Sequence, residues 1–158
     1  MIGMRILYFS KNYSTHDHRF LTKMVESGHE IFFMSLNNNR HLEARDIPAC
    51  VKIVTGYIEL SELDNPEKFL SLLPSFEEII KTISPDLIQA GPVQSCGFLV
   101  ALIDFHPFIL VSWGSDILVD ADKNELFNWI TRFTIKKSDR ILCDCNACLL
   151  YTSDAADE

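Results

Sequence analysis

Short apolar segments alternate with segments of helical hydrophobic spacing along most of this chain, and this alternation most constrains its fold. The apolar segments are short and largely lack interspersed polar residues, which is typical of strands buried on both faces. Strands that follow one another through helices form a parallel sheet with helices on both sides. The sequence therefore predicts an α/β fold with a doubly wound parallel sheet. The predicted strands are residues 4–10, 30–36, 51–57, 85–92, 107–116 and 139–145.

The segments between these strands carry apolar residues at intervals of three and four. Phe20, Met24 and Val25 follow this spacing, and Gly28 then stands where a helix C-terminal glycine is typical. Pro74 is expected to kink or divide the second of these helices. The later predicted helices are residues 65–84, 93–105 and 124–138.

Length and charge exclude several classes of protein. The 158 residues suffice for one domain with a hydrophobic core, and the net charge of −8 disfavours general nucleic-acid binding. The apolar runs are too short to cross a bilayer, and the N-terminal run predicts a buried strand instead of a signal peptide. An odd number of cysteines fits a reducing compartment, so we expect a cytoplasmic protein.

The cysteines of the CDCNAC segment do not predict a metal site. Zinc sites usually combine a C-x-x-C pair with a second, distant pair, and this chain has no such second pair. Cys143 and Cys145 share one face of a predicted strand, where cysteine behaves as a small apolar residue. We therefore expect neither a metal nor another bound cofactor.

Ligands of open parallel sheets bind beyond the carboxyl ends of the strands, which directs attention to three loops. The first loop has no glycine, which argues against a nicotinamide-binding turn. It offers Ser14, Thr15 and His16 at the start of a helix, as donors to a phosphate or a sugar hydroxyl. Helix capping by Ser14, Thr15 or Asp17 is the simpler role for these side chains, and His16 could be a solvated surface residue.

The second loop contains Gln89, Gly91, Pro92 and Gln94. Glycine permits a close approach of backbone, proline stiffens the turn, and the two amides can bind hydroxyl groups. A turn without a ligand would have the same composition.

The third loop runs from a buried strand into Trp113, Gly114, Ser115 and Asp116. Asp116 would place a carboxylate at the mouth of a crevice, and Trp113 could stack on a sugar ring. The alternatives are a turn acceptor for Asp116 and a place at the rim of the core for Trp113.

The order and spacing of four short motifs resemble the N-terminal domain of the family 4 glycosyltransferases. The motifs are SGHEI, PDLIQAGP, VSWGSD and SDRILC, and the resemblance extends from about residue 5 to residue 145. It implies the Rossmann-like N-terminal half of a two-domain GT-B enzyme. Such enzymes transfer a sugar from a nucleotide-sugar to an acceptor with retention of configuration and without a bound metal. The N-terminal half mainly holds the acceptor, and the C-terminal half holds the nucleotide and a paired-glutamate motif.

The resemblance also implies site residues, with two departures. Many members have a glycine pair in the first loop, near the donor phosphates, and this sequence has none. Many have histidine where Gln89 stands. We expect Asp116 and His16 to be catalytic residues. The expected substrate-binding residues are Ser14, Thr15, Gln89, Gly91, Trp113, Gly114 and Ser115.

The implied partners are a nucleotide-sugar, a saccharide or lipid-linked acceptor, and a C-terminal domain of the same enzyme, with no nucleic acid. Some relatives dock on the inner face of the membrane through a basic helix, so peripheral contact is the most that we expect. A basic patch could serve this purpose, although a solvated helix face is the simpler interpretation. Its residues are Arg132, Lys136, Lys137 and Arg140.

The C-terminal segment CLLYTSDAADE, residues 148–158, has a different origin in our interpretation. It resembles the translation, in one reading frame, of the transposase adapter used to prepare sequencing libraries. We therefore expect residues 1–147 to be the glycosyltransferase domain and residues 148–158 to be a non-native tail without structure. A fragment of this kind should have no transferase activity alone.

Two other classes of protein remain as alternatives. A flavodoxin-like electron-transfer domain fits the acidic charge and the hydroxyl-bearing first loop, although the glycine usual in such a loop is missing. A non-catalytic Rossmann-like binding module would keep the fold without needing His16 or Asp116.

Overall fold

The computed structural model describes residues 3–37, 41–55 and 66–157, and it confirms the predicted α/β fold with a parallel sheet. The strand order is β3-β2-β1-β4-β5-β6. The strands are β1 (Arg5–Ser10), β2 (Glu30–Ser35), β3 (Lys52–Val54), β4 (Leu87–Gly91), β5 (Phe108–Val111) and β6 (Arg140–Leu142). The longer helices are α1 (Thr15–Glu26), α2 (Pro66–Ile83), α5 (Glu125–Lys137) and α6 (Asn146–Asp157).

All six predicted strands are present, and each is shorter than predicted. Helix α2 continues through Pro74, so the predicted division of this helix does not occur. The predicted third strand extends to residue 57 and the predicted second helix begins at residue 65, and both of these positions lie outside the described residues.

Short helical segments replace some predicted elements of the second half. The segment predicted as one helix at 93–105 is a π-helical turn, η1 (Val93–Gly97), followed by α3 (Phe98–Leu102). A short helix, α4 (Ser115–Leu118), and a 3₁₀ turn, η2 (Asp120–Asp122), follow β5 where only a polar turn was expected. The chain forms two compact units, Met1–Ile88 and Gln89–Glu158.

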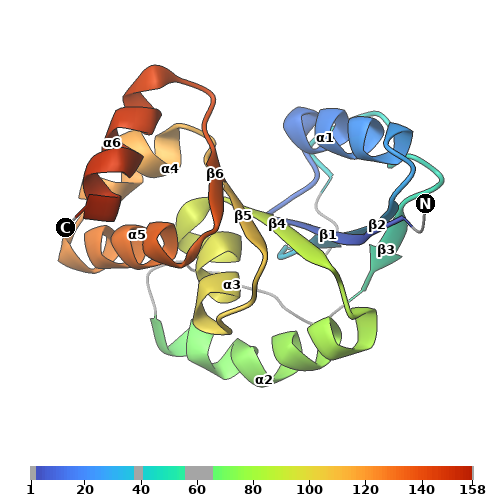
Figure 1. Cartoon of the computed structure of the whole chain (residues 1–158), viewed down its shortest axis with the longest axis horizontal. Coiled ribbons are helices and arrows are strands. Elements are labelled where there is room, and N and C mark those ends of the chain that lie inside the picture. Colours follow the sequence, from blue (N-terminus) through green and yellow to red (C-terminus); the bar gives the residue numbers. More distant parts are fainter. Residues whose placement is uncertain (1–2, 38–40, 56–65, 158) are drawn as a thin grey trace. The chain divides into compact units, whose positions relative to one another are not determined.

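In the first unit, β1, β2 and β3 pair in parallel, with Leu7 opposite Phe32 on β2. Helices α1 and α2 lie on opposite sides of these strands (Figure 1). Strands β1 and β2 are buried on both faces, as is typical of parallel sheets, whereas the edge strand β3 is exposed at Lys52 and Ile53. One cluster of buried side chains fills the space below α1: Ile6, Tyr8, Tyr13, Leu21, Ile31, Phe33 and Val51.

In the second unit, β5 and β6 pair in parallel, and α3 packs against α5. Gly91 allows a close approach of backbone at the end of β4. A Cβ atom at this position would lie 2.2 Å from the carbonyl oxygen of Val111 on β5. Only glycine is compatible with this close approach to β5. The substrate-binding role predicted for Gly91 stays a prediction.

The C-terminal segment forms helix α6, contrary to the expectation that the tail lacks structure. Its side chains at Cys148 and Thr152 are buried, and the helix packs against α4 and α5. Cys148 and Thr152, which are one helical turn apart, form its buried side, whereas Leu149 and Leu150 are exposed. The assignment of residues 148–158 to an adapter stays a prediction. Among the described residues, no helix is both long and apolar enough to cross a membrane.

Candidate functional site

The first predicted loop begins with a helix cap. Ser14 is the N-cap of α1, and its hydroxyl accepts a hydrogen bond from the Asp17 amide. The Asp17 carboxylate accepts in return from the Ser14 amide at 2.7 Å and also contacts the Ser14 hydroxyl. Asp17 is buried, and the hydroxyl of Tyr8 donates to its other oxygen at 2.9 Å. Ser14 and Asp17 thus form a capping box, the simpler of the two roles considered above.

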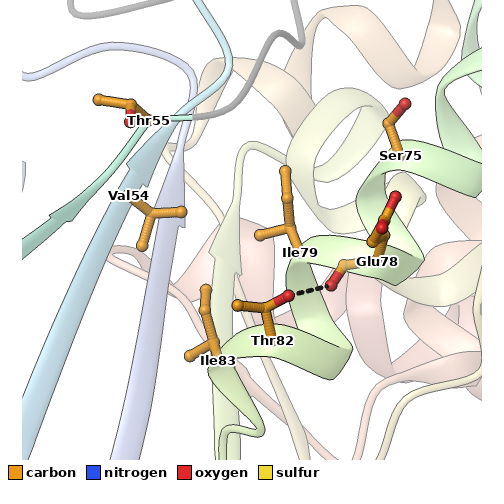
Figure 2. A pocket seen from close by; sticks show the side chains of 7 residues that line it. All are labelled: Val54, Thr55, Ser75, Glu78, Ile79, Thr82 and Ile83. Atoms are coloured by element: carbon orange, nitrogen blue, oxygen red, sulfur yellow. Dashed lines mark hydrogen bonds between the residues drawn. The ribbon is translucent and has the colours of Figure 1, made fainter.

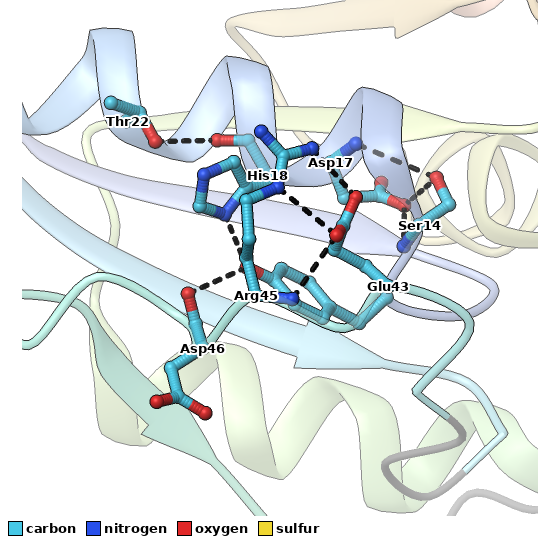
Figure 3. A network of polar contacts seen from close by, with 8 residues as sticks. Ser14, Asp17, His18, Thr22, Glu43, Arg45 and Asp46 are labelled. Carbon is cyan, nitrogen blue, oxygen red and sulfur yellow. Dashed lines mark hydrogen bonds and ion pairs between the residues drawn. The ribbon is translucent and has the colours of Figure 1, made fainter.

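The next two residues of this loop, Thr15 and His16, lie exposed on the first turn of α1. The Thr15 hydroxyl donates to the carboxylate of Glu43, which comes from the segment after β2. Arg45 holds the same carboxylate through its backbone amide at 3.1 Å and its guanidinium at 3.0 and 2.7 Å. Figure 3 shows Glu43 and Arg45 side by side next to α1, close to Ser14 and Asp17.

The Glu43 carboxylate is almost enclosed although its backbone lies near the surface. Its side chain is 8% exposed, whereas that of Arg45 is 52% exposed. Hydrogen bonds from the Arg45 side chain and amide, and from Thr15, hold the pKa of Glu43 well below its usual range. Glu43 is therefore a fixed anion at the first turn of α1.

Tyr13 belongs to the buried cluster and also contacts the segment that carries Glu43 and Arg45. Its hydroxyl lies 2.7 Å from Nδ1 of His18 and donates to the carbonyl oxygen of Asp46 at 3.0 Å. Burial and the nearby charge of Glu43 raise the pKa of Tyr13. The Leu42 amide donates to the carbonyl oxygen of Tyr13 at 2.7 Å, so Tyr13 holds the segment with Glu43 and Arg45 on both sides of this pair.

In the second unit, Asp116 joins the second and third predicted loops. One carboxylate oxygen accepts from the Ser112 hydroxyl at 2.9 Å and from the Trp113 amide at 3.1 Å. The other accepts from the amide of Val93, the first residue of η1, at 3.1 Å. The residue is 2% exposed. Burial raises the pKa of Asp116, and these hydrogen bonds oppose the rise.

The side chain of Gln94 extends this connection to α5. Its amide nitrogen donates to the Asp116 carbonyl oxygen and, at 2.8 Å, to the hydroxyl of Thr131. Thr131 donates in turn to the Phe127 carbonyl oxygen at 2.7 Å. Gln94 is buried, so its amide nitrogen serves the fold of this unit and is not directed to solvent.

Gln89 differs from Gln94. It lies on β4 and is 4% exposed, and its amide nitrogen has no hydrogen-bond partner among the described residues. A buried donor without a partner is costly in free energy, and such groups call for an explanation such as a bound ligand or water. The substrate-binding role predicted for Gln89 stays a prediction, and this unpaired donor supports it.

The remaining residues of the third loop form the start of α4. Gly114 has φ of +85°, in the left-handed region, so a side chain there would be strained. Ser115 is exposed and Trp113 half-buried. The structure thus gathers Trp113, Gly114 and Ser115 around Asp116, whereas Ser14, Thr15 and His16 belong to the other unit.

A group of potential metal ligands occurs at the start of α6. Asp144, Cys145 and Cys148 each offer one ligand atom, and these atoms lie within 4.8 Å of one another. Structural zinc sites use four ligands, and this group supplies three, of which Asp144 and Cys145 are exposed.

A pocket of about 400 Å³ lies in the first unit, between the carboxyl end of β3 and α2. Figure 2 shows Val54 and Thr55 on one side and the α2 side chains on the other. The hydroxyl of Thr82 is directed back to the carbonyl oxygen of Glu78 at 2.9 Å. The pocket has no polar side chain that is both buried and unpaired, so we assign it no ligand.

Comparison with protein families decides the classification. The model of the glycosyl transferase 4-like family matches residues 5–145, which is most of the chain. The chain belongs to the glycosyl transferase 4-like family. This match confirms the resemblance and covers the same residues, 5–145. The motifs that carry the resemblance are SGHEI, PDLIQAGP, VSWGSD and SDRILC. No curated protein matches the sequence.

Solved structures show the same fold for this glycosyl transferase 4-like chain. One structure of sucrose-phosphate synthase from Thermosynechococcus elongatus matches with a TM-score of 0.68 and 8% identity, over 93% of this chain and 80% of that one. A second structure of the same synthase matches with a TM-score of 0.68 and 7% identity, over 96% of this chain. The chain spans 45% of the length of that second structure.

Sequence reasoning missed the pair Glu43 and Arg45. They lie in a polar connecting segment that has no periodicity, and their contact with Thr15 depends on how that segment folds back over α1. The signal that could have found them is the short E-x-R spacing, which is common in surface loops. The capping box formed by Ser14 and Asp17 was easier to predict, because S-x-x-D is one form of the capping pattern.

Proposed function

We propose that this chain is the acceptor-side domain of a glycosyltransferase that moves a sugar from a nucleotide-sugar to an acceptor with retention of configuration. The observation that carries the proposal is the family match across residues 5–145. The acceptor is a saccharide or a lipid-linked saccharide, and a C-terminal domain of the same enzyme supplies the nucleotide site. The reaction uses no bound metal or other cofactor.

Asp116 and His16 enter this proposal in different roles. Every carboxylate oxygen of Asp116 is occupied by donors of its own unit, which supports a positioning role for the turn at Gly114. His16 is exposed on the first turn of α1, where it can meet an acceptor hydroxyl. Gln89 brings an unpaired amide nitrogen as a donor to a substrate oxygen.

We expect the 158-residue chain alone to be inactive, because the proposal assigns the nucleotide site to a C-terminal domain. The test begins with the source DNA, which we would sequence beyond the codon for Ala147. Continuation into a second α/β domain with two glutamates seven residues apart supports the proposal. A genuine stop codon after Glu158 contradicts it.

The recovered two-domain protein is then assayed with a panel of nucleotide-sugars and saccharide acceptors. We expect sugar transfer that preserves the anomeric configuration of the donor. NMR of the product measures this configuration. Replacing His16 by alanine should lower kcat with little effect on unfolding. Inverted product, or turnover by the 158-residue chain alone, would contradict the corresponding part of the proposal.

A further inference from the structure

The first turn of α1 has the features that attract phosphate in other proteins. A helix N-terminus carries a partial positive charge and unpaired amides, and Thr15 adds a hydroxyl. In this chain, however, two carboxylates already occupy that end of the helix. Asp17 is bonded to Ser14 and Tyr8, and Glu43 is bonded to Thr15 and Arg45.

We propose that Glu43 is a specificity-determining residue that closes the first turn of α1 to phosphate, so that this loop serves a neutral, hydroxyl-bearing ligand. The inference rests on the acceptor-binding role proposed above, and it restricts the ligand groups that can bind at this loop to uncharged ones. A donor phosphate must then be bound elsewhere in the enzyme.

The contacts of Glu43 carry this step. Its carboxylate receives the Thr15 hydroxyl and the Arg45 guanidinium, the two groups that would otherwise bind a phosphate oxygen. Its side chain is 8% exposed, so it is held in the loop by its neighbours and does not move freely in solvent. An incoming phosphate would meet a negative charge at short range and would find both donors engaged.

Replacing Glu43 by glutamine reverses this arrangement with little change in volume. The negative charge disappears, and the guanidinium of Arg45, which is 52% exposed, becomes available for bidentate binding. The variant should therefore gain a phosphate site made of Arg45, Thr15 and the amides of the first turn.

The experiment is a titration of the 158-residue chain with inorganic phosphate at pH 7.5, followed by ¹⁵N NMR of the Thr15, His16 and Asp17 amides. We expect no saturable shift of these amides in the unmodified protein. Glu43→Gln should give saturable shifts at these amides, with a Kd at least about fivefold below the lower limit that the unmodified protein sets, the effect of one nearby charge in water. Adding Arg45→Gln should remove the gain.

The matched control is Glu77→Gln, an equal charge change at an exposed position of α2 beside Lys81. It should bind phosphate no better than the unmodified protein. Saturable binding at the first turn in the unmodified protein overturns the proposal without any variant. Equal affinities of the Glu43→Gln and Glu77→Gln proteins overturn it as well. Because phosphate binding is measured without sugar transfer, failure of this inference is distinct from failure of the proposed transferase activity.

Discussion

The amide of Val93 donates to Oδ2 of Asp116 at 3.1 Å, and this bond joins the segment after β4 to the first turn of α4. The other oxygen of Asp116 holds Ser112 and Trp113 at the end of β5. One buried carboxylate thus fixes two of the loops that follow the strands of this unit. The sequence offered Asp116 as a candidate for catalysis or for a turn acceptor, and these contacts support the second role directly.

Replacing Asp116 by alanine should lower the free energy of unfolding of the second unit by about 3 kcal/mol, since several donors lose their acceptor at once. Urea unfolding followed by tryptophan fluorescence measures this change, because both tryptophans, Trp113 and Trp129, lie in that unit. The control is Ser115→Ala, a change at the exposed neighbouring position. Unfolding midpoints that agree between the two variants would contradict the role given to Asp116.

Two threonines of α5 offer a matched pair for the role of Gln94. The hydroxyl of Thr131 accepts from Gln94 at 2.8 Å, whereas that of Thr134 is buried without a partner among the described residues. Thr131→Val should therefore destabilise the unit by about 1–2 kcal/mol. Thr134→Val should be neutral or stabilising, because it removes an unpaired buried hydroxyl at nearly constant shape. Urea unfolding of both variants tests this, and the opposite ranking would refute it.

His106 should make the stability of the second unit depend on pH. Its Nδ1 lies 2.8 Å from the carboxylate of Asp139 and its Nε2 lies 3.5 Å from that of Asp104. The hydrogen bond to Asp139 raises the pKa of His106, and burial opposes this. A raised pKa in the folded state means that the stabilisation is complete below the ordinary value of 6.5 and is lost as pH rises through the folded value.

We therefore expect the urea midpoint of the second unit to fall between pH 6 and pH 8, beyond the change seen in a His106→Gln variant. His106 is the one histidine in the sequence of that unit, so the comparison isolates a single imidazole. Equal slopes of midpoint against pH in the two proteins would show that the ion pair with Asp139 does not persist in solution.

The strands and most of the helices could be predicted from sequence because their apolar spacing is local and regular. The positions of Gly28 and Gly91 were likewise predictable, since the backbone favours glycine at each: φ is positive at Gly28, and Val111 approaches closely at Gly91. Pro74 does not divide α2, and the buried side chains of Phe69 and Phe76 on either side of it favour one continuous helix. The alternative prediction of a kink at Pro74 stays a prediction.

The site was less predictable, because its contacts link residues far apart in sequence. The sequence around Gln94 does not indicate that its amide contacts Thr131. The sequence around Thr15 likewise does not indicate a contact with Glu43. Composition does predict that such polar residues gather in loops, and it cannot say which of them bond to each other. Gln89 and Gln94 illustrate this limit. Both belong to one predicted loop, yet the amide nitrogen of Gln94 is hydrogen-bonded and that of Gln89 has no partner among the described residues.

The start of α6 brings two cysteines into a reactive arrangement. The sulfur atoms of Cys145 and Cys148 lie 3.2 Å apart, with Cys145 exposed and Cys148 buried. Hydrogen bonds from the amide and thiol of Cys148 lower the pKa of Cys145, whereas burial raises the pKa of Cys148 to about 11. Cys145 is therefore the thiol that ionises first and attacks an external disulfide.

Oxidised glutathione should convert this pair to a disulfide. The Cys145 thiolate displaces one glutathione thiolate and forms a mixed disulfide; Cys148 then loses its proton, and its sulfur displaces the second glutathione. Two electrons pass from the protein to the reagent, and the free thiols fall from five to three.

Thiol titration and intact mass measure this loss of two thiols, with Cys50→Ser as a control that should leave the reaction unchanged. A Cys145→Ser protein that still loses two free thiols to an intramolecular disulfide, or a mixed disulfide that persists at Cys145, would refute the assignment.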